Sequence, residues 1–169
     1  VHNFCSEWWS WPLMLSRGVL FWEDNNRHVW CIGNPIVWIG STIGVVCCVL
    51  FILTEAEEKA HIISLLLGYV FSYFPFALIS RSSFNYHYLV PLMFAIMCLI
   101  TVLSKFDEKY HSFIAVLVIV ATVVSFIWIA PVVYGEHILS VESRLPFAAW
   151  RTPKYAGNIV ENTQISNEL

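Results

Sequence analysis

Long apolar runs dominate the central part of this chain, and short polar segments separate them. The runs without a charged side chain cover residues 35–53, 62–80, 89–104 and 112–135. A membrane-spanning helix needs roughly 20 apolar residues, because each residue adds about 1.5 Å along the axis. The third run reaches that length when residues 84–88 form its first turn. The pattern therefore predicts four spans, at residues 34–53, 62–80, 84–104 and 112–135.

Composition agrees with this pattern. Hydrophobic residues make up 58% of the chain and charged residues 12%, far from the balance of soluble domains. The predicted fold class is therefore an all-α membrane protein with four transmembrane helices. A net charge of −3, with no basic patch that has interleaved aromatic residues, argues against a nucleic-acid partner. Basic residues flank both ends of the predicted spans, so the positive-inside rule does not fix the orientation.

The segments outside the runs differ from one another. Six of the eight tryptophans fall within the first 38 residues, a composition typical of a segment along the membrane surface. We expect these indoles to form a structural belt, with a binding role as the alternative. The predicted organisation is an interfacial Trp-rich segment at 1–33, a membrane region at 34–135 and a polar tail at 136–169. The chain does not begin with Met, and we expect it to be part of a longer protein.

A polar and aromatic cluster, residues 81–91, lies between the second and third runs. Ionisable groups held at a membrane boundary are usually functional. The guanidinium of Arg81, the imidazole of His87 and the phenols of Tyr86 and Tyr88 could together hold an anionic or hydroxyl-rich ligand. The alternatives are an Arg81 that only extends toward the headgroups and a His87 that hydrogen-bonds the backbone at a helix end. Prolines 75 and 91 flank the cluster and suggest a cavity there.

Within the first run, Gly40 and Gly44 form a Gly-x-x-x-Gly motif, which lets a second helix approach closely. Packing within the molecule is the expectation, and dimerisation is the alternative. Asn34 and Pro35 are predicted to start this helix, as its cap and its first residue. The five cysteines show no metal-ligand spacing, so no metal site is predicted. Cys5 and Cys31 could pair if their side of the membrane is oxidising.

Four segments of the chain carry a family resemblance. They are WPLMLSRGV at 11–19, VWCIGNPIVW at 29–38, FPFALISR at 74–81 and FNYHYLVP at 84–91. Together and in this order, they resemble the C-terminal four-span region of the eukaryotic protein O-mannosyltransferases over about residues 8–134. The departures are local. Family members more often have a second His where Tyr86 stands and a proline closer to Leu89 than Pro91 is.

The resemblance implies part of a GT-C type glycosyltransferase in the endoplasmic reticulum membrane. The family transfers mannose, with inversion, from dolichyl-phosphate mannose to Ser or Thr of secretory proteins. Its acidic pair in the first luminal loop has no match here, and Glu23 and Asp24 are interpreted as solvated loop charges. The chain is therefore expected to hold no catalytic residue and to be inactive alone. Its contribution would be to the luminal donor pocket, with the candidates Arg81, Tyr86, His87, Tyr88 and Asn34.

The resemblance also implies partners and an orientation. We expect dolichyl-phosphate mannose, secretory proteins, membrane lipid and, as a dimer partner, a related mannosyltransferase, but no cofactor; a metal requirement is left open. Residues 1–33, 81–88 and 136–169 would be luminal, and residues 54–60 and 105–111 cytosolic. The final four residues, 166–169, are close to a luminal retrieval signal. The leading alternative is a non-catalytic four-span scaffold or subunit; a transporter fits less well, because the charges lie at the span ends.

Overall fold

The computed structural model describes residues 4–16, 18–25, 27–54, 59–137, 144, 145, 147 and 150. Residues 55–58, most of the predicted tail and the final four residues lie outside this range. The elements follow the order η1 (Trp8–Ser10), β1 (Val19–Asp24), β2 (Arg27–Cys31), α1 (Pro35–Thr54), α2 (Lys59–Tyr73), η2 (Phe74–Leu78), η3 (Asn85–Tyr88), α3 (Leu89–Ser104) and α4 (Glu108–Val133), where η marks a 3₁₀ helix.

Among the described residues, four helical stretches are long and apolar enough to cross a membrane: Pro35–Thr54, Lys59–Leu78, Asn85–Ser104 and Glu108–Val133. The predicted four-span helical fold is confirmed, and the chain is a multi-pass membrane protein. The 3₁₀ helix η3 supplies the first turn of the third span. The second span changes from α2 to η2 at Phe74, since Pro75 has no N–H to donate to the preceding turn.

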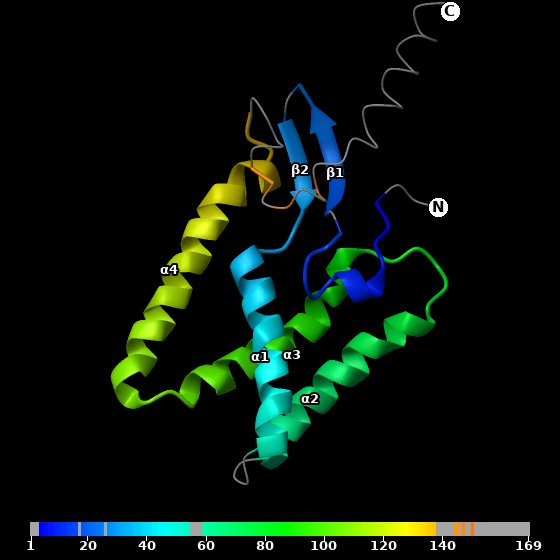
Figure 1. Ribbon diagram of the computed structural model, residues 1–169. Coiled ribbons are helices and arrows are strands. Elements are labelled where there is room, and N and C mark those ends of the chain that lie inside the picture. The colour runs from blue at the N-terminus through cyan, green and yellow to red at the C-terminus, as the bar shows by residue number, and fades with distance from the viewer. Residues whose placement is uncertain are drawn as a thin grey trace, which may run out of the picture.

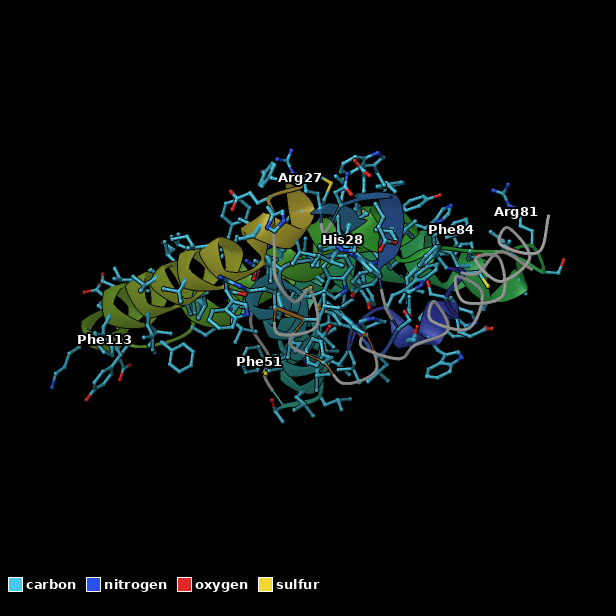
Figure 2. All side chains as sticks on the ribbon, turned by 90° about the horizontal axis from the view of Figure 1, so that it is seen from above. Arg27, His28, Phe51, Arg81, Phe84 and Phe113 are labelled. Atoms are coloured by element: carbon cyan, nitrogen blue, oxygen red, sulfur yellow. The ribbon has the colours of Figure 1, made fainter. Side chains whose placement is uncertain are left out.

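Helix α3 packs between α1 and α2, whereas α4 leans against α1 and β2 (Figure 1). Much of α4 faces outward, and its Phe113, Ile119 and Ile127 are strongly exposed. In Figure 2, Phe113 lies at the outer edge of the molecule, near the start of α4. Because lipid tails are as apolar as these side chains, such a surface is suited to the bilayer interior.

An antiparallel hairpin of β1 and β2, which the sequence pattern did not predict, covers one end of the bundle (Figure 1). We call this the hairpin end. Asn25 in the turn has φ +43°, a conformation that Asn tolerates in tight hairpins. The register shifts between Leu20 and Trp22, and this bulge breaks the strict alternation by which a strand is detected in sequence. Contacts between β2 and α4 hold the hairpin over the bundle, together with an isolated antiparallel β-bridge between the backbones of Arg27 and His137.

The main core lies at the hairpin end and is rich in aromatic rings. It includes Trp11, Trp38, Tyr69, Tyr73 and Tyr88, all nearly or fully buried. The predicted tryptophan belt is therefore wrong for Trp11, Trp30 and Trp38, which are core residues. For two of them, protein atoms satisfy the indole N–H: Trp11 donates to Ser6 Oγ at 2.8 Å, and Trp38 donates to the Trp11 carbonyl at 2.6 Å. The indole N–H of Trp30 has no partner among the described residues. Trp9 and Trp22 remain exposed.

Candidate functional site

The cluster predicted to be functional forms the connection from η2 to α3 at the hairpin end. Residues 79–83 of this connection and residues 5–8 of the N-terminal segment form two walls of a cavity of about 310 Å³. The amide of Ser6 donates to the carbonyl of Ser83 at 2.8 Å and joins the two walls. We call this the Arg81 cavity. Its position after Pro75 agrees with the expectation of a cavity beside the prolines.

The Arg81 cavity is lined by one basic, one acidic and several hydroxyl side chains. Arg81 is exposed, and among the described residues it forms no ion pair. The N-terminal segment contributes Glu7 and Trp8 to the facing wall. The hydroxyl groups come from Ser6, Ser80, Ser82 and Ser83. A guanidinium beside several hydroxyl groups can bind a phosphate or a similar anion through charge-assisted hydrogen bonds. In Figure 2, Arg81 projects at the edge of the molecule, well away from Arg27 and His28 of the hairpin.

Glu7 is a lining residue that the sequence reasoning missed. It is 74 positions before Arg81 in the chain. The bond between Ser6 and Ser83 and the contacts between η1 and η2 bring the two segments together. The sequence signal that could have identified Glu7 is a carboxylate within the Trp-rich segment, which was predicted to lie at the membrane boundary.

His87 does not line the Arg81 cavity but supports the turn behind it. Its Nδ1 accepts the N–H of Phe84 at 3.2 Å, which leaves the ring proton on Nε2. In the tautomer that carries its proton on Nδ1, this atom instead donates to the Phe84 carbonyl, 3.0 Å away. The imidazole also stacks on Tyr86, with ring centroids 4.6 Å apart, and more distantly on Trp11. The geometry thus matches the alternative in which a helix-end His bonds the backbone.

Tyr88 lies in the core rather than at a cavity. Its side chain is fully buried, and its hydroxyl is 3.0 Å from that of Tyr69. The ring packs against Tyr73 and Trp38. Tyr88 therefore fixes the start of α3 against α1 and α2, behind the exposed ring of Tyr86.

Asn34 caps α1, as the sequence predicted. Its Oδ1 accepts the amide N–H groups of Ile36 at 3.0 Å and Val37 at 3.4 Å, and Pro35 is the first helical residue. Its Nδ2 donates to the carbonyl of Thr122 in α4 at 2.9 Å. The Oδ1 of Asn34 thus caps α1, and its Nδ2 joins α1 to α4.

A second cavity, of about 270 Å³, brings Asn34 and Tyr86 together. It lies between the β2–α1 connection and the start of α3, and most of its lining is apolar. Asn85, which the sequence reasoning also missed, borders it with its side chain almost completely buried. We call this the Asn85 cavity. The predicted site residues therefore divide among the Arg81 cavity, the Asn85 cavity and the aromatic core.

The two glycines of the first span face α3. A Cβ at Gly44 would lie 2.6 Å from the backbone N and Cα of Leu99, whereas one at Gly40 would lie 3.6 Å from the Leu99 side chain. The Gly-x-x-x-Gly motif thus permits close packing of α1 on α3 within the molecule.

The structure also places the remaining charged and thiol groups. Glu23 of β1 lies 3.6 Å from His28 of β2, on the hairpin. Within the described residues, no three His, Cys, Asp or Glu side chains are grouped as a metal site would require. Cys5 and Cys31 are free thiols, so the pairing considered from sequence is not formed. Burial raises the pKa of the Cys31 thiol.

Comparisons with known proteins place these features in a family. Residues 1–151 match the family described as the C-terminal four TMM region of protein-O-mannosyltransferase. Dolichyl-phosphate-mannose–protein mannosyltransferase 1 of Saccharomyces cerevisiae is 31% identical over 79% of this chain and 19% of its own length. The enzyme of the same name from Candida albicans is 24% identical over 88% of this chain and 20% of its own length.

A solved structure is similar in fold. It is the S. cerevisiae protein O-mannosyltransferase Pmt1–Pmt2 complex bound to the sugar donor, with a TM-score of 0.71 and 27% identity over 80% of this chain and 22% of that chain. The present chain thus spans about a fifth of the length of the curated relatives it matches. Because the family match covers nearly the whole chain, this protein belongs to the family of C-terminal four-transmembrane regions of protein O-mannosyltransferases.

Proposed function

We propose that this chain is the C-terminal membrane part of an enzyme that transfers mannose from dolichyl-phosphate mannose to Ser or Thr of secretory proteins. Two relatives carry this donor and activity in their names, and the structural neighbour is bound to its sugar donor. The hairpin end would then face the lumen of the endoplasmic reticulum. A partner mannosyltransferase is supported by the neighbour, which is a Pmt1–Pmt2 complex.

The Arg81 cavity is the observation that carries this proposal. When the bond from mannose to phosphate breaks, negative charge builds on the phosphate that leaves, and a guanidinium with nearby hydroxyl donors stabilises that charge. Arg81 and the serines of residues 80–83 supply these groups at the end of the second span. Asn34, Tyr86, His87 and Tyr88 then act mainly by positioning the start of α1 and α3 around this corner.

The catalytic base would come from outside this chain. Deprotonation of an acceptor hydroxyl needs a base within hydrogen-bond reach. Asp107 and Glu108 lie at the opposite end of the bundle from Arg81, roughly 30 Å of hydrocarbon away. Glu23 and Asp24 are on the hairpin strand β1, outside the lining of the Arg81 cavity. Glu7 lines that cavity, where the departing phosphate would bind, whereas the base of an inverting transfer acts on the opposite face of the sugar.

A chimera tests this division of labour. We would replace the matching region of S. cerevisiae mannosyltransferase 1 with this chain and assay transfer from dolichyl-phosphate mannose to a Ser/Thr-rich peptide. The expected result is transfer by the chimera and none by the 169-residue chain alone. A chimera that inserts and accumulates normally but transfers no mannose would favour the non-catalytic scaffold. Transfer by the isolated chain would contradict the proposed absence of a base.

A further inference from the structure

Two residues of opposite charge line the Arg81 cavity without forming an ion pair. Arg81 comes from the connection after η2, Glu7 comes from the N-terminal segment, and both residues are exposed. Among the described residues, neither of them has an ionic partner. A ligand that offers a negative group to Arg81 and hydrogen-bond donors to Glu7 would satisfy both side chains.

The backbone of Glu7 is held in place, but its carboxylate is not used by the fold. The Glu7 carbonyl accepts the N–H of Ser10 at 3.0 Å and the Ser10 hydroxyl at 2.6 Å. Glu7 is the N-cap of η1, yet its side chain makes no capping hydrogen bond. A carboxylate is acceptor-only and can accept two O–H groups at once, so its natural ligands here are hydroxyl groups.

Trp8 gives the same wall of the cavity an aromatic surface. Its ring packs edge-on against Tyr73, with centroids 5.4 Å apart, and lies 5.9 Å from the ring of Phe74. The Tyr73 hydroxyl also donates to the Trp8 carbonyl at 2.9 Å. These contacts fix the half-buried indole where it lines the cavity. Because the face of an indole carries negative potential, it attracts the C–H groups on one side of a sugar ring.

The proposed donor brings a sugar to this wall. In a dolichyl-phosphate sugar the ring is bonded directly to the phosphate, so a phosphate held by Arg81 keeps the sugar in the same cavity. The cavity volume of about 310 Å³ is within the usual range for a small-molecule site. The exposed hydroxyls of Ser80 and Ser82 can both donate and accept, as the hydroxyls of a sugar require.

We propose that Glu7 binds hydroxyl groups of the donor sugar, with Trp8 against the ring and Arg81 on the phosphate. This inference rests on the proposed function, which places the phosphate at Arg81. Glu7 is then a residue that recognises the sugar and takes no part in deprotonating the acceptor. Its carboxylate also favours the exchange of product for a new donor, because it repels the phosphate of dolichyl phosphate once the sugar has left.

A zwitterionic phospholipid headgroup is the alternative ligand for the same charges. Its phosphate would meet Arg81, and its ammonium group would meet Glu7 and the ring of Trp8. An ammonium group only donates hydrogen bonds, so it makes less use of the hydroxyls of Ser80 and Ser82. The two ligands differ in a measurable way, because only the sugar makes the contribution of Glu7 depend on mannose.

The test compares the binding of dolichyl-phosphate mannose and of dolichyl phosphate to the full-length natural protein. Nanodiscs of phosphatidylglycerol are used, since this lipid has no ammonium group. Glu7→Ala should weaken binding of the mannosylated lipid about 10–100-fold, as expected for lost hydrogen bonds to a charged group. Its affinity for dolichyl phosphate should not fall, because the change removes a repulsive charge. Arg81→Ala should weaken the binding of both lipids.

A matched control and a set of modified donors locate the contact. Glu136→Ala removes another exposed carboxylate, one that follows α4 and lies outside the lining of the Arg81 cavity, and should change neither affinity. Donors that each lack one hydroxyl of the mannose are then bound to the unmodified protein and to Glu7→Ala. For at least one donor, the loss seen with the unmodified protein should be absent in Glu7→Ala, because both changes remove the same hydrogen bond.

The possible contrary outcomes separate this inference from the proposed function. Equal weakening of both lipids by Glu7→Ala, or additive effects for every modified donor, would overturn the role of Glu7. Adding phosphatidylethanolamine to the nanodiscs should not affect donor binding. Competition by this lipid that is lost in Glu7→Ala would assign the site to a phospholipid headgroup instead. Unchanged binding of both lipids in Arg81→Ala would contradict the proposed function itself. Retained binding of dolichyl phosphate shows that the Glu7 variant is folded.

Discussion

His87 and Tyr88 are adjacent in the chain, yet the fold gives them different surroundings. The imidazole is half-buried in a stack of rings and bonded to the Phe84 peptide, while the phenol is enclosed by Trp38, Tyr69 and Tyr73. A 3₁₀ turn has three residues per turn, so neighbouring side chains diverge by about 120°. Among the predicted site residues, Arg81 and Tyr86 are the ones whose side chains are exposed.

Replacing Arg81 tests its role in transfer. In the full-length enzyme, we expect Arg81→Ala to raise the barrier to mannosyl transfer by about 2–4 kcal/mol, since a charge-assisted contact to the departing phosphate is lost. Arg81→Lys should restore only part of the rate, because it keeps the charge but not the planar fork. Both effects are measured as the steady-state rate of mannosyl transfer by each variant at matched protein levels.

Arg27→Ala is the matched control for Arg81→Ala. It removes another exposed arginine at the hairpin end that lies outside the Arg81 cavity. Its transfer rate should be close to that of the unmodified enzyme. Wild-type rates for Arg81→Ala as well would show that Arg81 only anchors the chain at the membrane surface.

Cys31 provides a test of burial in β2. Because burial disfavours the thiolate, the pKa of Cys31 lies above its ordinary value of 9.0 in the folded protein. The folded protein therefore favours the neutral thiol. The contribution of this preference to the free energy of unfolding is fully present below pH 9.0 and is lost as the pH rises through the folded pKa. In a variant with Cys31 as its only cysteine, maleimide labelling should rise at a higher pH in the native than in the denatured protein. Coincident pH profiles would contradict the burial of this thiol.

The elements begin and end where local chemistry dictates. Asn34 and Pro35 start α1, Pro75 converts α2 into η2, and Pro91 is tolerated because it lies in the first turn of α3. Side-chain volume then decides which helix faces meet. The small residues Gly40, Ser41 and Gly44 of α1 allow α3 to approach, and Ser41 and Gly44 are buried.

The two glycines of α1 should differ in their tolerance of a methyl group. Gly44→Ala places Cβ against the Leu99 backbone and should destabilise the helix pair by about 1–3 kcal/mol, the usual effect of overpacking. Gly40→Ala makes only an ordinary contact and should be nearly neutral. Thermal unfolding of the purified protein in detergent measures both. Equal tolerance at the two positions would mean that α1 and α3 pack less closely than described.

At the scale of the whole molecule, the chain divides into a tight three-helix unit and a more loosely attached fourth helix. α1, α2 and α3 share the aromatic core, while Asn34 and the hairpin connect α4 to them. The connections between successive spans alternate between the two ends of the bundle, so the hairpin, the connection from η2 to α3 and the end of α4 are on one side (Figure 1).

This alternation gives a topology prediction. Glycosylation acceptor sites inserted after Gly135 should be modified in the endoplasmic reticulum, whereas sites inserted within residues 54–60 should not. The chain has no Asn-x-Ser/Thr acceptor of its own, so the background is clean. Glycosylation of each inserted site is detected as a decrease in gel mobility that treatment with an endoglycosidase reverses. Modification within residues 54–60 would reverse the proposed orientation.

The sequence alone determined the four spans, the cap at Asn34 and the family, because apolar length, capping residues and short motifs are local properties of a chain. It located the polar connection at residues 81–88 but not which of its side chains face a cavity. Only the tertiary structure placed Glu7 in the lining of the Arg81 cavity, buried Tyr88 and Asn85, and formed the hairpin over α1 and α4. These features depend on contacts between segments far apart in the chain, and no periodicity in the sequence records which segments meet.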